Sequence, residues 1–190
     1  MLSKISQHKY YHIALFLFLY GFFYWGNYIY TGLTVPGGYY SSFLDHYLNY
    51  VKLYRNFLLE CCAFLIRLTG QETFMYDHGI HLRNGGVQLI YACLGFAIFS
   101  FWWAMILAFP QTRRNKLTFL LAGTVIIIVL NIIRITSVAL VFSSKWGAAH
   151  RGFDHHMLFN IVVYGILFYM LYRWFNLPAP AETEPKPSQN

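Results

Sequence analysis

The sequence predicts an all-α polytopic membrane protein with about four transmembrane helices. Of its 190 residues, 57% are hydrophobic and only 11% are charged, whereas about 25% of a soluble domain is charged. The apolar residues gather in long runs and the charges lie between them, as membrane topology requires. Three cysteines are too few for a disulfide scaffold. The net charge of +7 comes without a basic run interleaved with aromatic residues, so nucleic acid is not an expected partner.

Four apolar runs each approach the about 20 residues that a helix needs to cross the hydrocarbon core. They are residues 10–31, 87–109, 117–142 and 157–175. The first is bulky and aromatic to its end, which predicts an uncleaved anchor rather than a signal peptide. The link before the third run carries Arg113, Arg114 and Lys116 and no acid, which places this link and both termini on the cytoplasmic side. Residues 1–177 then form a single integral membrane domain, and residues 178–190 a disordered cytoplasmic tail.

The segment 36–86 does not fit a simple span, because its helical middle, residues 43–68, is rich in charge. The charged residues are Asp45, Lys52, Arg55, Glu60 and Arg67. We expect one or two amphipathic helices on or partly in the outer face, with a substrate groove between them and the spans. If residues 43–68 crossed instead, the chain would have five spans. Residues 72–92 are punctuated by Asp77-His78-Gly79 and Asn84-Gly85-Gly86, which predicts a short hairpin leading into the second run.

Arg134 lies deep in the third run and is flanked by isoleucines. An arginine in hydrocarbon costs about 2.5–3.5 kcal/mol on insertion scales, and this one lies ~12 Å from the outer end of its run. It is either a site cation that faces the bundle interior or a structural arginine bonded to carbonyls or a carboxylate. Asn131 lies three residues earlier on the same helix face. It either orients the guanidinium or bonds another helix.

Cys93 lies at the outer end of the second run, close to Gly95. A buried cysteine is usually packing, but a nearby helix N-terminus and a cation such as Arg134 would favour the thiolate. His155 and His156 begin the fourth run, where a histidine is either a general acid or base or part of a helix cap. A nucleophile, a cation and a proton carrier therefore lie in the outer third of three different runs. This combination indicates a thiol-dependent acyl-transfer site.

Taken in order, these residues resemble the core of the exosortase/archaeosortase family of membrane cysteine transpeptidases. The motifs that carry the resemblance are Asp77-x-Gly79-Ile80, Gly85-Gly86, Ala92-Cys93-Leu94-Gly95, Asn131-x-x-Arg134-Ile135 and His156-x-x-Phe159-Asn160. The chain is also similar in its brevity to the short bacterial members. It departs from the family at Leu94, where serine is frequent. The doubled histidine leaves the third role open between His156, which the spacing to Asn160 favours, and His155.

The resemblance implies a membrane-embedded cysteine protease or transpeptidase of the bacterial cytoplasmic membrane, with its site on the outer, periplasmic face. Its substrates would be exported proteins with a C-terminal motif, a transmembrane helix and a basic tail. They would be cleaved and transferred to a surface acceptor, a glycan or a lipid, although the sequence leaves hydrolysis by water open. No metal or organic cofactor is needed. The implied site residues are Cys93 (nucleophile), Arg134 (thiolate or oxyanion stabiliser) and His156 (proton carrier, His155 second choice), with Asn131, Gly95 and Asn160 in support.

Two rival interpretations stay open. The chain could be a metal-binding membrane protein. The candidate ligands are His78, His81, His150, Asp154, His155 and His156. Against this, residues three apart on a hairpin point to opposite faces. The chain could also be a non-enzymatic assembly or transport component, with Arg134 structural and Cys93 mere packing. That interpretation predicts that Cys93→Ala is silent while Arg134→Ala is not.

Overall fold

The structure is a computed structural model that describes residues 2–35, 39–76, 78–83, 85–143 and 155–178. The predicted tail, residues 178–190, therefore lies almost wholly outside the described residues. The elements in chain order are α1 (Leu2–Thr34), α2 (Ser42–Tyr47), α3 (Tyr50–Leu68), β1 (Thr73–Tyr76), β2 (Gly79–Leu82), β3 (Gly85–Gln88), the 3-10 helix η1 (Tyr91–Leu94), α4 (Phe96–Ala108), α5 (Arg113–Ser143) and α7 (His155–Phe175).

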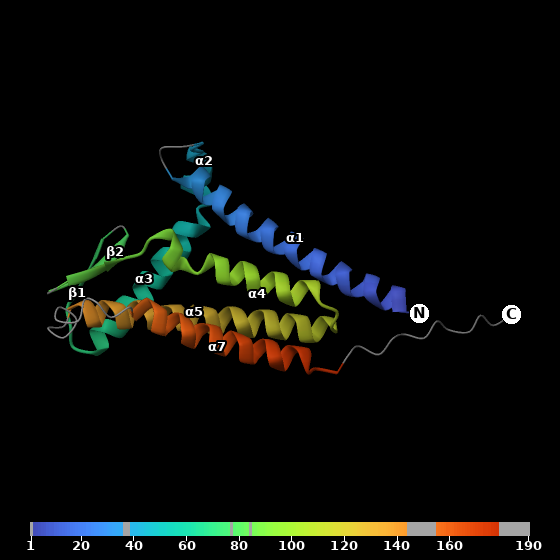
Figure 1. The fold of residues 1–190 in the computed structure, drawn as a ribbon. Coiled ribbons are helices and arrows are strands. Elements are labelled where there is room, and N and C mark those ends of the chain that lie inside the picture. Colours follow the sequence, from blue (N-terminus) through green and yellow to red (C-terminus); the bar gives the residue numbers. More distant parts are fainter. Residues whose placement is uncertain (1, 36–38, 77, 84, 144–154, 179–190) are drawn as a thin grey trace.

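Most of the described chain is helical, as the sequence predicts. Within the described residues, two segments are long and apolar enough to cross a membrane, Tyr10–Thr34 in α1 and Arg113–Val141 in α5. α4 and the apolar part of α7 are shorter. α1 packs mainly on α4, α4 on α5, and α5 on α7, so the four helices run beside one another (Figure 1). The sheet and α3 lie at one end of this bundle, here called the sheet end, and the link from α4 to α5 lies at the other.

The second expected span differs from what the structure contains. We expected a helix over residues 87–109, but α4 begins only at Phe96 because Gly85–Gln88 pair as β3. Thirteen helical residues extend ~20 Å, which is less than the ~30 Å of a hydrocarbon core. α5 also starts earlier than expected, so that Arg113, Arg114 and Lys116 belong to its first turns. Lys116 donates from Nζ to the carbonyl of Leu107 at 2.9 Å, which ties the two helices together at this end.

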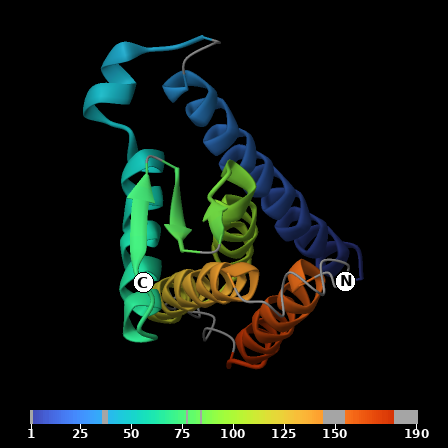
Figure 2. The ribbon, with the colours of Figure 1, turned by 90° about the vertical axis from the view of Figure 1, so that its left-hand side faces the viewer.

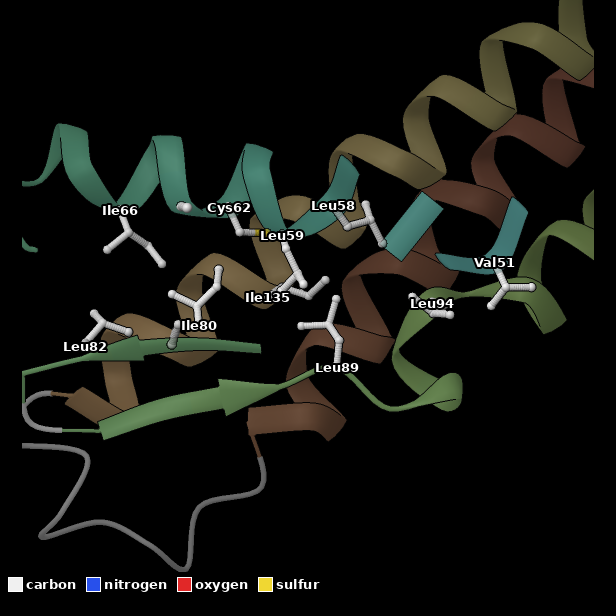
Figure 3. Close-up of a cluster of buried hydrophobic side chains, with 12 residues drawn as sticks. Val51, Leu58, Leu59, Cys62, Ile66, Ile80, Leu82, Leu89, Leu94 and Ile135 are labelled. Atoms are coloured by element: carbon white, nitrogen blue, oxygen red, sulfur yellow. The ribbon is translucent and has the colours of Figure 1, made fainter. Parts of the chain in front are cut away.

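α3 is an amphipathic helix whose apolar side is buried. Asn49 caps it by accepting a hydrogen bond from the backbone N–H of Lys52 at 2.8 Å. Its buried residues recur with helical spacing and include Leu58, Leu59, Cys62, Ala63 and Ile66. Lys52 and Arg67 on the other side are exposed. Figure 3 shows how the apolar side chains of α3 point toward the sheet and α5.

The predicted hairpin is present as β1 and β2, but a third strand extends it. The sheet is antiparallel in the order β1-β2-β3. It packs against both α3 and α5, and Figure 2 shows its strands beside α3. Glycine is required at Gly79, since a Cβ there would lie 2.4 Å from the carbonyl oxygen of Val87 on the neighbouring strand. The close approach of β2 and β3 thus fixes the point from which the chain leaves β3 toward η1.

The buried side chains form two clusters that share α5. The first, at the sheet end, joins α3, the sheet and the η1 connection to Ile135 and Ala139 of α5. The second joins α4 and α7 to Ile127 of α5. Trp102 of α4 is fully buried in this second cluster and donates from Nε1 to the carbonyl of Phe119 at 3.2 Å. The boundary between the two clusters therefore falls on α5 between Ile127 and Ile135.

Candidate active site

Cys93 lies in the connection between the sheet and α4. β3 ends at Gln88, and η1 carries Cys93 just before α4 begins. The backbone N–H of Cys93 donates to the carbonyl of Ile90 at 2.8 Å, which closes the 3-10 turn. The side chain is a free thiol and is half-buried. Cys93 is thus held on a short rigid turn at the sheet end of the bundle, and solvent reaches part of it.

Gly95 reverses the chain between η1 and α4. Its φ is +79°, in the left-handed region that favours glycine, and its carbonyl accepts hydrogen bonds from the N–H groups of Ile98 and Phe99 at 3.0 and 3.1 Å. A Cβ at this position would lie 3.6 Å from Nδ2 of Asn131, which is ordinary contact. The requirement for glycine therefore comes from the backbone angle and not from a lack of space.

Asn131 links α5 to the turn that carries Cys93. Its Nδ2 donates to the carbonyl oxygen of Cys93 at 3.0 Å, and its side chain is 7% exposed. Of the two roles considered from the sequence, orienting the guanidinium or bonding another element, the structure contains the second. A buried amide that satisfies a backbone carbonyl fixes the position of that carbonyl. The main chain at Cys93 is therefore anchored to α5.

Arg134 lies one turn beyond Asn131 on α5, and its side chain is half-buried. Residues three apart share a helix face, so Arg134 follows Asn131 along the side of α5 that contacts Cys93. The structure thus brings the expected cysteine and asparagine into direct contact. It places the expected arginine one helical turn from that contact.

His155 and His156 are the first residues of α7. α7 begins at the sheet end of the bundle (Figure 1), which is the end that also carries Cys93. The side chains of both histidines, and that of Asn160, lie outside the described residues. The backbone therefore puts the histidine pair at the expected end of the bundle, and their roles stay predictions.

The other two cysteines lie side by side in the sequence on α3, away from the turn that carries Cys93. Cys62 on α3 is completely buried and its Sγ lies 3.7 Å from the carbonyl oxygen of Ile132. Cys61 is half-buried and faces an apolar hollow between α3 and α5. The sequence interpretation of this pair as packing fits the burial of Cys62. Cys93 is the cysteine that combines partial exposure with a position on a turn.

Tyr54 on α3 is a neighbour of the site that the sequence analysis missed. Its ring centroid lies 5.7 Å from that of Phe96 and 6.0 Å from that of Phe99, at the start of α4. Its hydroxyl is buried and interacts with the side chain of Asn131. Nothing in the sequence distinguishes Tyr54 from the other aromatic residues of α3, since only the tertiary fold brings its ring beside the start of α4.

A groove of about 810 Å³ opens between α3 and the helices α1, α4 and α5. We expected a substrate groove between the segment that contains α3 and the spans. Its walls are apolar and come from α1, α3, α4 and α5. Residues that line it include Phe23, Gly26, Tyr54, Phe96, Trp103 and Ile128. Phe96 and Tyr54 connect the groove to the turn that carries Cys93. The groove therefore reaches the start of α4, three residues after Cys93.

The metal-site interpretation gains no support from the described residues. Among them, no group of three or more histidine, cysteine, aspartate or glutamate side chains could hold a metal ion. His81 pairs with Phe74 and Gly86 in the sheet, and His78 precedes β2. The histidines from 150 to 156, which completed the proposed ligand set, have no described side chains.

These features define a helical membrane protein in which one half-buried cysteine is anchored to a long apolar helix near an arginine. A comparison with protein families adds the particular family. The family model for transmembrane exosortases matches residues 10–173, and the chain belongs to this family. Members are membrane-integral cysteine proteases and transpeptidases that act on exported proteins with C-terminal sorting signals. A search of curated proteins and a search of solved structures each gave no match.

Proposed function

We propose that the protein cleaves the C-terminal sorting signal of exported proteins with Cys93 as the nucleophile, and transfers the new carboxyl end to a surface acceptor. The observation that carries this proposal is the hydrogen bond between Asn131 and the carbonyl of Cys93. It fixes a half-exposed thiol beside the face of α5 that bears Arg134, in a chain of a cysteine transpeptidase family.

The chemistry follows from these groups. The Cys93 thiolate, stabilised by Arg134, attacks the carbonyl carbon of the scissile peptide, and the carbonyl electrons move onto oxygen. The tetrahedral intermediate collapses, the C–N bond breaks, and the departing amine takes a proton from His156. A thioester remains on Cys93. An acceptor amine or hydroxyl, deprotonated by the histidine, attacks this thioester, releases the thiolate and completes the transfer, and water in its place gives hydrolysis.

We infer that the site faces the periplasmic side of the cytoplasmic membrane. Cys93 precedes α4, whereas Arg113 and Arg114 follow it in the first turn of α5, so the thiol and the basic residues lie at opposite ends of α4. Short basic connections stay in the cytoplasm. The start of α1 and the end of α7 lie at the same end as the basic residues (Figure 1), which supports four crossings and cytoplasmic termini.

The apolar groove is the route by which the transmembrane helix of a sorting signal reaches the site. A helix in lipid keeps its own backbone satisfied and presents apolar side chains, and the groove wall offers apolar and aromatic partners along α1 and α3. A helix seated there would present the peptide that precedes it to the turn that carries Cys93.

The test replaces Cys93 with Ala in the full chain and follows the size and surface location of exported proteins that carry a C-terminal helix and basic tail. We expect these proteins to accumulate unprocessed while the variant reaches normal abundance in the membrane. Cys61→Ala is the matched control, because Cys61 is a half-buried thiol outside the site, and it should process normally. Unchanged processing in Cys93→Ala would refute the proposal.

Two further pairs of variants assign the remaining roles. His155→Ala and His156→Ala separate the two histidines, and the proposal requires the loss to follow His156. Arg134→Lys retains the charge but lacks the planar fork, so it should retain part of the activity that Arg134→Gln loses. If both histidine variants process normally, the proton is carried by another group and that part of the mechanism is wrong.

A further inference from the structure

A second hollow, separate from the apolar groove, lies beside the turn that carries Cys93. Its volume is about 450 Å³. The end of α1, the start of α3, the turn before β2 and the connection from β3 to η1 surround it. Tyr91 and Leu94, on either side of Cys93 in η1, are part of its wall, and Figure 3 shows Leu94 near Val51 of α3. Unlike the groove, this pocket contains charged residues.

The charges in the pocket are mostly positive. Lys52 and Arg55, one turn apart on α3, both line it, and His78 lies on another side. The carboxylate in the wall is Asp45, which accepts hydrogen bonds from Nδ2 of Asn49 at 2.8 Å and from the hydroxyl of Tyr40 at 2.9 Å. These bonds lower the pKa of Asp45, so it is charged at neutral pH. Among the described residues that line the pocket, two permanent cations outnumber this one anion.

Arg55 has unused hydrogen-bonding capacity. Its Nε is buried and has no hydrogen-bond partner among the described residues. A buried guanidinium N–H without an acceptor is costly, and a bound anion would supply the missing acceptor. Arg55 also borders a neighbouring hollow, which Lys52, Glu60 and Tyr76 line as well.

The start of α3 adds to the positive potential. Asn49 and Val51, at the first turn of this 19-residue helix, line the pocket. The N-terminus of a helix carries about half a positive charge and attracts anions. No acidic residue lies in the first turn of α3 to neutralise it. The helix end, Lys52 and Arg55 therefore act on the same volume.

We propose that this pocket binds a phosphate group, either free phosphate or the phosphate of a lipid headgroup. Donors approach the pocket from several elements: Lys52 and Arg55 from α3, His78 from the turn before β2, and Gln88 from β3. Such a distribution suits the tetrahedral oxygens of phosphate better than the two coplanar oxygens of a carboxylate, and an arginine fork binds phosphate with two parallel hydrogen bonds. The pocket adjoins the end of α1, where a spanning helix reaches the level of lipid headgroups.

The experiment measures binding to the purified full chain in detergent by isothermal titration calorimetry. The probes are inorganic phosphate, glycerol 3-phosphate and short-chain phosphatidylglycerol, with glutamate at equal ionic strength as the carboxylate comparison. We expect Arg55→Gln to weaken phosphate binding by about tenfold or more, because a charge-assisted bidentate contact is lost. Lys52→Gln, at an exposed position, should weaken it by about threefold. Arg83→Gln removes an exposed charge outside the pocket and should leave binding unchanged.

The outcomes separate the ligand sources. Binding of all three phosphate probes identifies the shared phosphate group, and binding of phosphatidylglycerol alone identifies the lipid headgroup. The proposal fails if Arg55→Gln and Lys52→Gln bind phosphate like the parent chain, or if glutamate binds as tightly as phosphate. If Arg55→Gln does not fold, Arg55→Lys and Lys52→Gln decide, and the proposal requires each to bind more weakly than Arg83→Gln. Binding is measured without turnover, so the result is independent of the Cys93 test.

Discussion

Replacing Gly95 with Ala tests whether the backbone reversal after Cys93 matters for its chemistry. A residue with a Cβ in the left-handed region costs about 1–2 kcal/mol, and Gly95 has φ +79°. No steric term adds to this, because the nearest atom to the new Cβ would lie 3.6 Å away. For a chain of this size the loss corresponds to a decrease in the unfolding temperature of about 2–8 °C.

Gly70 provides the matched control for this substitution. Its φ is +82°, and a Cβ there would meet nothing within 4 Å, so Gly70→Ala should lower the unfolding temperature by the same amount. Gly70 lies after α3, away from Cys93. If the strained backbone at residue 95 relaxes by moving η1, the thiol shifts relative to Asn131 and the bound peptide. Misplacement by about 1 Å can cost about a hundredfold in rate.

The assay combines thermal unfolding in detergent with processing of an exported substrate in cells. We expect both alanine variants to be equally destabilised, but only Gly95→Ala to lose processing, by about tenfold or more. Gly95→Asn should lose less, since asparagine tolerates the left-handed region. Processing by Gly95→Ala at the rate of Gly70→Ala would show that the reversal only connects two helices, and would refute the reasoning.

Three further predictions concern packing and access. Gly123→Ala would place a Cβ 2.1 Å from the indole of Trp102 and should destabilise the chain by about 1–3 kcal/mol, whereas Gly26→Ala, with open space around it, should change the unfolding temperature little. Gly26→Trp would fill part of the apolar groove and should reduce processing of a substrate with a transmembrane helix while leaving the fold intact. A maleimide should modify Cys93 in the folded chain and modify Cys62 only after unfolding, because Cys62 is fully buried; equal labelling would contradict this burial.

The helices could be predicted from the sequence because apolar runs of that length have few alternatives. The start of α4 could not, since Val87 and Leu89 are as apolar as the helix that follows. The helix begins late because residues 85–88 pair with β2 as the strand β3. The left-handed residue Gly95 then reverses the chain just before α4. Both depend on tertiary contacts, because four-residue strands rich in glycine have little preference of their own.

The candidate site could be predicted only as a set of residue types on successive runs. The sequence left open whether Asn131 orients Arg134 or bonds another helix. The structure contains a hydrogen bond from Asn131 to the carbonyl of Cys93. This bond depends on the tertiary contact between α5 and the turn η1, which the sequence does not show. The phosphate pocket had no sequence signal, since Arg55 and His78 are 23 positions apart along the chain, and Arg55 looked like one more charge on an amphipathic helix.

The two buried clusters sharing α5 have different physical origins of stability. The cluster at the sheet end brings apolar residues together in a region that includes charged and exposed positions, so exclusion of water stabilises it. In the proposed topology the cluster of α4, α5 and α7 is surrounded by lipid, where close packing of side chains stabilises it instead. Urea should therefore loosen the first, and a harsh detergent the second. Asn131 lies on α5 between Ile127 of one cluster and Ile135 of the other. Loosening of either cluster would therefore disturb its hydrogen bond to Cys93.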